Sequence, residues 1–335
     1  MEVNRRRFLK GLTAMGIGLS AVSIAKLGVS REAFQGKRVG IIGLDTSHSV
    51  AFTKAMNAPG ADTKLKGYKV VAAYPYGSKT IESSAKRIPG YVEEVKNFGV
   101  MITDSITALL EQVDVVLLET NDGRLHLEQV LPVFKAGKRV FIDKPIAASL
   151  ADTKAIFAAA RQYNVPTFSS SSLRYIENIP NLASGKAIGA ITGVDAFAPA
   201  TLESTHPDLF WYGIHGVELL YALLGTGCNE VRRVYGEGTD IVVGTWSDGR
   251  VGIFRGIRQG KGGFGGMAYG TDGQQALGTY GGYLPLLYRV VEFFDTGSVP
   301  VSPEETTELV AFMEAADESK RRGGAAVSIK ELLKV

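Results

Sequence analysis

The stretch "GIIGLDTSH", which ends at His48, contains side chains suited to binding an anion. It is predicted to form a strand, a turn and the start of a helix, where a dinucleotide-binding fold holds a pyrophosphate. Gly43 keeps the first glycine of a GxGxxG turn, whereas Asp45 and His48 occupy its second and third glycine positions. Thr46, Ser47 and His48 can donate hydrogen bonds, but the charge of Asp45 disfavours a phosphate. The stretch predicts either a phosphate site or a plain capped turn.

His48 and Asp45 are also candidate metal ligands, because imidazole and carboxylate groups bind divalent cations. No third ligand lies at a suitable spacing in the sequence, so we predict no metal site. Gly43, Asp45, Thr46, Ser47 and His48 are therefore kept as candidates for cofactor binding.

Two further segments place polar side chains directly after apolar, strand-like runs. Thr120 and Asn121 follow "DVVLLE", and Asp143 and Lys144 follow "RVFI". Because the carboxyl ends of parallel strands lie at one edge of a sheet, all four belong to the predicted ligand-binding edge. Pro145 disfavours a helical backbone at Lys144, so the lysine ammonium would be presented at the strand tip. Lys144 is therefore a candidate for proton transfer.

The segment "DLFWYGIHGVELL" carries a second candidate for proton transfer. His215 lies in the first turn of a predicted helix, whose positive end favours the neutral imidazole that a general base requires. A histidine that only packs the helix is the alternative interpretation. Neighbouring residues, and those ending an earlier strand-like run, are candidates for lining a sugar cleft: Arg174, Tyr175, His206, Trp211 and Tyr212.

The elements that would position these residues alternate between strand and helix over residues 37–168. This alternation predicts a Rossmann-like domain, a doubly wound parallel sheet with helices on both faces. Over residues 169–335, consecutive strand-like segments with a few helices predict an α+β domain with an open, mostly antiparallel sheet. A final helix over residues 303–322, capped by Ser302, is expected to pack back on the first domain.

The composition is that of a globular protein without a nucleic-acid partner. Hydrophobic residues make up 45% of the chain and charged residues 21%, and 335 residues suffice for two domains. The net charge of +3 is carried by the N-terminal segment, and the remainder is nearly neutral. No strongly basic surface for nucleic acid or anionic lipid is therefore predicted.

The first 30 residues are predicted to be an export leader. The run "NRRRFLK" matches a twin-arginine signal, and the apolar run after it ends before Lys26, which makes it too short for a stable membrane span. Cleavage near Ala25 would release the protein into the periplasm. An uncleaved leader that anchors the protein to the membrane is the alternative.

Several segments together resemble the Gfo/Idh/MocA oxidoreductases, the family of glucose–fructose oxidoreductase and inositol dehydrogenase. They are "VGIIG", "HLEQVLPVFKAGKRVFIDKP", "GIHGVELLYALLG" and "SPEETTELVAFMEAADESKRRG". The resemblance runs from Lys37 to the C-terminus and implies a Rossmann domain, a second domain for substrate and oligomer contacts, and NAD or NADP. Lys144 matches the lysine of the family's Glu-Lys-Pro motif, with Asp143 replacing glutamate, and His215 matches the family's active-site histidine.

The sequence departs from the family pattern at the glycines replaced by Asp45 and His48 and at further positions. The second strand, "YKVVAAYPY", lacks the acidic residue that would bind the adenosine ribose. Ser78 and Lys79, which follow it, would contact a 2′-phosphate instead, and this slightly favours NADP. Trp211 stands where the family usually has an aspartate before the histidine, and Glu218 stands where it often has another.

The resemblance and the candidate residues predict an NAD(P)-dependent oxidoreductase acting on a sugar, polyol or glycoside hydroxyl. His215 would take the hydroxyl proton, while Lys144 would orient that hydroxyl and stabilise the developing oxyanion. An exported enzyme would have to hold its cofactor tightly, and a homo-oligomer formed through the second sheet is expected. One alternative is a redox-neutral lyase or NAD-dependent glycosidase working through transient sugar oxidation. Another is a non-catalytic sugar-binding protein whose nucleotide site has decayed.

Overall fold

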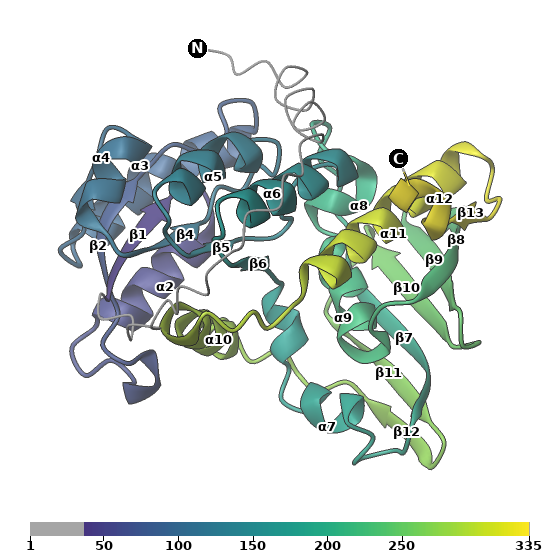
Figure 1. Ribbon diagram of the computed structural model, residues 1–335. Helices are drawn as coiled ribbons and strands as arrows, with labels where there is room; N and C mark the ends of the chain where they lie inside the picture. The colour runs from purple at the N-terminus through teal and green to yellow at the C-terminus, as the bar shows by residue number, and fades with distance from the viewer. Residues whose placement is uncertain (1–36, 335) are drawn as a thin grey trace, which may run out of the picture.

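The first domain is built on a six-stranded parallel sheet with strand order β3-β2-β1-β4-β5-β6 (Figure 1). The structure is a computed structural model and describes residues 37–334. The strands are β1 (Arg38–Ile42), β2 (Lys69–Tyr74), β3 (Met101–Ile102), β4 (Val115–Leu118), β5 (Val140–Ile142) and β6 (Thr167–Ser169). The order reverses between β1 and β4, so the carboxyl ends of these two strands form the switch point where such sheets bind ligands.

Helices cover both faces of this sheet, as the apolar strands require. The helices are α2 (Ser47–Asn57), α3 (Glu82–Lys96), α4 (Ile106–Gln112), α5 (His126–Lys135) and α6 (Leu150–Gln162). On one face, α4, α5 and α6 pack Leu109, Val130 and Ile156 into a common core with the strands. On the opposite face, α2 and α3 pack Phe52 and Val95. The sheet edge with the strand carboxyl ends is left for a ligand.

The second domain contains a seven-stranded sheet of order β12-β11-β7-β10-β9-β8-β13. Its strands are β7 (Ile191–Pro199), β8 (Cys228–Tyr235), β9 (Thr239–Trp246), β10 (Val251–Ile257), β11 (Gly265–Gly270), β12 (Gly273–Ala276) and β13 (Val327–Ser328). Neighbouring strands run antiparallel except for the parallel pair β7 and β10. Helices α9 (Ile214–Leu224) and α11 (Pro303–Arg321) pack against one face of this sheet.

This architecture confirms the predicted fold class. The predicted C-terminal helix is α11, and it contacts both domains. Its Glu314 Oε1 accepts a hydrogen bond from Leu150 N at 2.6 Å at the start of α6, while other residues of the helix pack on β8 and α9. An additional helix, α10 (Leu284–Thr296), was not predicted. It returns from the second sheet to the first domain, where Val290 and Phe293 join the core beneath α2.

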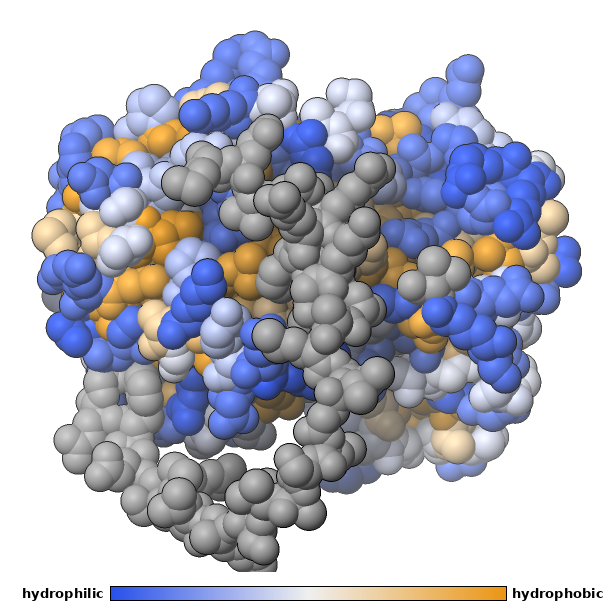
Figure 2. All heavy atoms as spheres, turned by 45° about the horizontal axis from the view of Figure 1, so that its top comes forward, coloured by the Kyte–Doolittle hydropathy of each residue, from blue (hydrophilic) through white to orange (hydrophobic). Residues whose placement is uncertain are grey.

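The predicted leader lies outside the described residues, so export stays a prediction. Among the helices of residues 37–334, none is long and apolar enough to cross a membrane. On the face drawn in Figure 2, hydrophilic residues predominate and hydrophobic residues form small patches between them.

A buried ion cluster ties β8 to the helices of the second domain. The Arg233 side chain is inaccessible to solvent and pairs with Asp240 Oδ2 at 3.0 Å, with Asp208 Oδ2 at 2.9 Å and with Asp317. Asp240 also pairs with Arg258, and Asp208 also pairs with Lys320 at 2.7 Å, so removal of the guanidinium would leave Asp317 without its ion-pair partner and would weaken the network around the other two carboxylates.

We expect Arg233→Ala to lower the free energy of unfolding by about 3–5 kcal/mol, because it removes one partner of a buried ion-pair network and leaves the space of a fully buried side chain unfilled. Urea denaturation measures this loss. The matched control is Arg232→Ala on the same strand, whose exposed guanidinium pairs with the exposed Glu230 and contributes about 0–1 kcal/mol. Equal losses in the two variants would contradict the importance of the cluster.

Candidate active site

The turn between β1 and α2 lies at the switch point and is built around Gly43. The φ angle of Gly43 is +91°, and a Cβ at this position would lie 2.5 Å from Thr120 N. Only glycine therefore fits where the turn passes the end of β4. Thr46 caps α2, because its hydroxyl accepts a hydrogen bond from His48 N at 2.9 Å. The first glycine and the helix N-terminus of a phosphate-binding turn are thus both present.

Asp45 uses its carboxylate to join three strand ends. Its side chain is fully buried, and it accepts hydrogen bonds from Asn121 N at 2.9 Å and Ser78 N at 3.1 Å. Burial raises the pKa of the Asp45 carboxyl, and the two backbone donors partly oppose this effect. A Cβ at Gly77 would lie 2.3 Å from Asp45 Oδ2, so the chain passes close to this carboxylate. Asp45 thus fixes the loops after β2 and β4, and it is not among the residues that line the cavity described below.

Lys144 lies at the end of β5, on the same edge of the sheet. Its backbone N–H donates to Asp143 Oδ1 at 2.8 Å, which fixes the Asp143 side chain beside the strand end. The Lys144 side chain is 8% exposed, and its Nζ lies 5.9 Å from the centre of the Tyr212 ring in the second domain. The ammonium therefore points across the boundary between the two domains.

His215 is held at the start of α9 by the segment that links the domains. The Ser171 hydroxyl lies 2.7 Å from His215 Nδ1. Glu218, one turn further along α9, accepts hydrogen bonds from Ser170 Oγ at 2.8 Å and Ser171 N at 3.2 Å. Burial, followed by the nearby charges of Lys144 and His48, holds the pKa of His215 well below its usual value. The imidazole is therefore neutral at pH 7 and able to accept a proton.

Lys144 and His215 line one cavity of about 280 Å³ between the two domains. The α2 N-terminus and α3 form its wall on the first domain, and aromatic rings form most of the opposite wall. The lining residues are Thr46, Ser47, His48, Ser83, Arg87, Asn121, Lys144, Ser172, Leu173, Trp211, Tyr212, His215, Phe264, Tyr280 and Tyr283. Proton-transfer candidates from two domains thus share a single space.

Three residues predicted to line the sugar cleft lie elsewhere. Arg174 is paired with Glu218 Oε1 at 2.8 Å and with Glu305 Oε1 at 2.6 Å, so these two carboxylates engage its guanidinium. Tyr175 packs against the core that contains α10. His206 faces Asp122 Oδ1 at 3.5 Å and joins the second domain to the loop after β4.

Four residues predicted to bind the cofactor were Ser78 and Lys79, for a 2′-phosphate, and Thr120 and Asn121, at the sheet edge. Ser78 is buried, and its hydroxyl donates to Asp122 Oδ2 at 2.8 Å, which leaves it no free face for a 2′-phosphate. Lys79 is exposed and lies 5.2 Å from the Tyr76 ring. Thr120 is buried against the turn at Gly43. Of this set, only Asn121 opens into the cavity.

Several lining residues were not predicted from the sequence. Ser83 and Arg87 belong to a helix that looks like an ordinary polar surface helix, and Arg87 Nη1 donates to the Asp45 carbonyl at 3.2 Å. Phe264, Tyr280 and Tyr283 come from loops and carry no local signal. Glu119 was also missed, although an acidic residue closing the apolar run "DVVLL" could have indicated a site.

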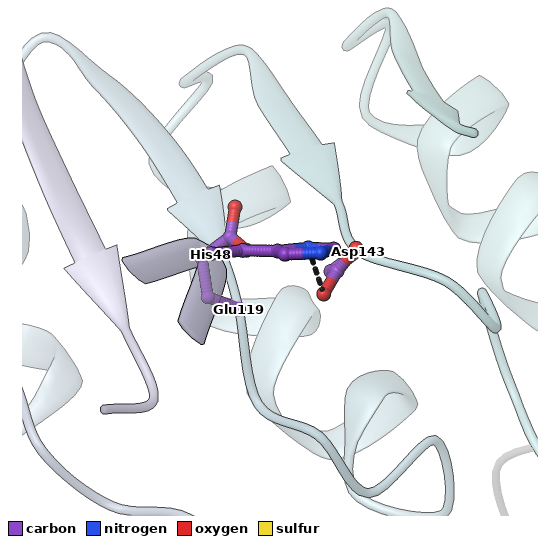
Figure 3. A group of neighbouring side chains, drawn as sticks. All are labelled: His48, Glu119 and Asp143. Carbon is purple, nitrogen blue, oxygen red and sulfur yellow. Dashed lines mark ion pairs between the residues drawn. The ribbon is translucent and has the colours of Figure 1, made fainter. Parts of the chain in front are cut away.

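His48, Glu119 and Asp143 form a buried cluster beneath the cavity (Figure 3). His48 Nδ1 lies 2.9 Å from Asp143 Oδ2 and 3.9 Å from Glu119 Oε2. Burial and the neighbouring Asp143 raise the pKa of Glu119 well above its usual value. Burial acts to raise the pKa of Asp143 as well, but the contact with His48 outweighs it and keeps that pKa below the usual value. Asp45, the partner considered for His48 in the sequence, does not take part.

Known proteins resemble this chain in its first domain and in its fold. Residues 37–170 match the family model described as an oxidoreductase family with an NAD-binding Rossmann fold, GFO_IDH_MocA. A 120-residue segment is 32% identical to 1,5-anhydro-D-fructose reductase from Ensifer adhaerens and spans 34% of this chain and 35% of that protein. The match therefore covers about a third of the relative's length.

Solved structures share the two-domain fold. Scyllo-inositol dehydrogenase from Lactobacillus casei, solved with NAD(H) and scyllo-inositol, superposes with a TM-score of 0.69 at 17% identity, covering 88% of this chain and 100% of that one. An oxidoreductase from Thermotoga maritima superposes with a TM-score of 0.69 at 17% identity, and the match covers 89% of this chain and 100% of that one. The family model thus matches the first domain, and the solved structures show that the two-domain fold is shared.

Proposed function

We propose that this protein is an NAD(P)-dependent oxidoreductase that acts on a hydroxyl group of a sugar or polyol. The proposal rests on one observation: Lys144 and His215, from different domains, line the same cavity beside the N-terminus of α2. A cavity at the switch point of a doubly wound sheet is the usual place for a ligand in this fold.

The cavity wall fits the phosphate and nicotinamide end of a dinucleotide. Thr46 and Ser47 open the positive end of α2 into the cavity, and Arg87 adds a cation to the same wall. Asp45 does not line the cavity, and its carboxylate is bound by two backbone N–H groups, so it does not face a phosphate there. A bound nicotinamide would supply the hydride acceptor. The adenosine end is expected to extend outside this cavity, because its volume is small for a whole dinucleotide.

His215 is the general base of the proposed reaction. Its neutral imidazole accepts the proton of the substrate hydroxyl, and the contact of Nδ1 with Ser171 fixes the ring. In the tautomer in which Nδ1–H donates to Ser171, Nε2 is the proton acceptor. Glu218 is a positioning residue in this account, since it holds Ser170 and Ser171 in place.

Lys144 orients the substrate hydroxyl and stabilises its oxygen as the proton leaves. A fixed ammonium in a small cavity with little solvent interacts more strongly with an alkoxide than it would in water. The aromatic rings of Trp211, Tyr212, Phe264 and Tyr280 complete the wall opposite the sheet edge. Such rings pack against the C–H faces of a sugar or polyol.

We also propose that the chain forms a homo-oligomer through the face of the second sheet opposite α9 and α11. Phe197, Val234 and Val251 are exposed on three strands of this sheet, and Val234 is 69% exposed. Light scattering of the purified protein is expected to give a multiple of the monomer mass. A monomer at all concentrations would contradict this proposal.

Arg87→Met is expected to weaken dinucleotide binding by about 10- to 100-fold, because a cation contacting phosphate contributes about 1.5–3 kcal/mol. Titration of NADH or NADPH, followed by cofactor fluorescence, measures the affinity. The matched control is Lys86→Met, which removes the neighbouring cation on the same helix, one that faces solvent and pairs with Glu82. Equal affinities in the two variants would argue against Arg87 as a phosphate contact.

Denaturation of the purified wild-type protein is expected to release NAD or NADP, identified by mass spectrometry. His215→Asn should release the same cofactor but turn over a polyol substrate about 10²- to 10⁴-fold more slowly, because it lacks the base. A cofactor-loaded His215→Asn variant with wild-type turnover would exclude this role. Absence of any dinucleotide from the wild type would favour the sugar-binding alternative, and product formation without an electron acceptor would favour the lyase.

A further inference from the structure

The cluster of His48, Glu119 and Asp143 brings three potential metal ligands to one point. One atom from each residue lies within 4.8 Å of the other two, and all three residues are buried. They come from the N-terminus of α2 and the carboxyl ends of β4 and β5, so the backbone of the sheet edge holds them together. Figure 3 shows the His48 ring directed at the Asp143 carboxylate, with Glu119 beside His48.

The polar atoms of this cluster lack hydrogen bonds. Within residues 37–334, Glu119 Oε1 and Oε2, His48 Nδ1 and Asp143 Oδ2 have no hydrogen-bond partner. The contact between His48 and Asp143 at 2.9 Å is therefore an ion pair without good hydrogen-bond geometry. Glu119 is completely inaccessible to solvent. Leaving such groups unsatisfied in the interior is costly, and an ion at their centre removes the cost.

We propose that His48, Glu119 and Asp143 bind a divalent transition-metal ion at the floor of the cavity. One imidazole and two carboxylates suit Zn²⁺, Mn²⁺ or Fe²⁺, with ligand distances of about 2.0–2.2 Å. The two carboxylates balance the charge of the ion. The Lys144 ammonium, which lines the cavity, is a further positive charge near Glu119 and Asp143 and lowers the affinity for a cation.

The position of the cluster indicates an open coordination site. His48 lines the cavity, whereas Glu119 and Asp143 lie beneath it and are 0% and 1% exposed. An ion held by these three residues would keep a coordination position directed toward the cavity. Three protein ligands with an open position are typical of catalytic rather than structural zinc sites. A substrate oxygen near Lys144 would then also be within reach of the ion.

The test is the metal content of the untagged full-length protein, purified without chelators and measured by inductively coupled plasma mass spectrometry. We expect about one equivalent of Zn²⁺, Mn²⁺ or Fe²⁺ per chain. After EDTA treatment, calorimetric titration with ZnCl₂ or MnCl₂ should restore one site per chain. Because neither measurement requires turnover or NAD(P), they succeed or fail independently of the proposed oxidoreductase function.

Glu119→Gln and Asp143→Asn keep the size of each side chain and should each weaken binding by about 100-fold or more, since loss of even an outer-shell partner costs 10- to 100-fold. The matched control is His206→Gln, which breaks a second buried histidine–aspartate contact that has no third ligand among the described residues. It should leave metal binding unchanged. Circular dichroism of each variant checks that it is folded.

Absence of metal from the wild type, together with no heat on titration, would overturn the proposal. The polar atoms of the cluster would then be satisfied by bound protons or by a buried water molecule. Metal bound equally well by folded Glu119→Gln and Asp143→Asn would place the site elsewhere and would also overturn it. Loss of metal in both variants, with retention in His206→Gln, would support it.

Discussion

The arrangement of the site depends on the buried carboxylate of Glu218. Its Oε1 atom accepts hydrogen bonds from Ser170 Oγ, Ser171 N and Arg174 Nε, all on the segment that leaves β6 for the second domain. Glu218 belongs to α9, so these bonds tie the domain crossing to the helix that carries His215. They place Ser171 against the His215 ring, and that ring opens into the cavity beside Lys144. Without these hydrogen bonds, the positions of Lys144 and His215 relative to each other would depend only on how the two domains pack together.

A second constraint joins the loops at the switch point. In the usual phosphate-binding turn, the second glycine lets the backbone approach the pyrophosphate and the third lets the helix pack closely on the strand. Here the Asp45 carboxylate binds the backbone after β2 and β4, and His48 reaches Asp143 at the end of β5. The two replacements therefore act as one unit. Together they link the carboxyl ends of β1, β2, β4 and β5. The N-terminus of α2 and Arg87 still face the cavity.

The fold could be predicted well from the sequence because the residue patterns that indicate strands and helices are local. Apolar strand runs alternating with amphipathic helices are sufficient to predict a Rossmann-like sheet, and the positions of Lys144 and Asn121 after such runs place them at its edge. The sequence could not show that Arg174 and His206 are engaged by Glu218 and Asp122, because those partners are distant along the chain. For the same reason, the sequence suggested Asp45 as the second metal-ligand candidate beside His48. In the structure, Glu119 and Asp143, which lie far along the chain, are the residues that cluster with His48.

Label transfer from substrate to cofactor tests the central claim most directly. The protein is incubated with a polyol carrying deuterium at the carbon of the reactive hydroxyl, then denatured, and the released dinucleotide is weighed by mass spectrometry. If Lys144 and His215 act on a hydroxyl beside a bound nicotinamide, the dinucleotide gains one deuterium in the wild type and none in Lys144→Met. A dinucleotide that stays unlabelled with every polyol and sugar tried would contradict this account.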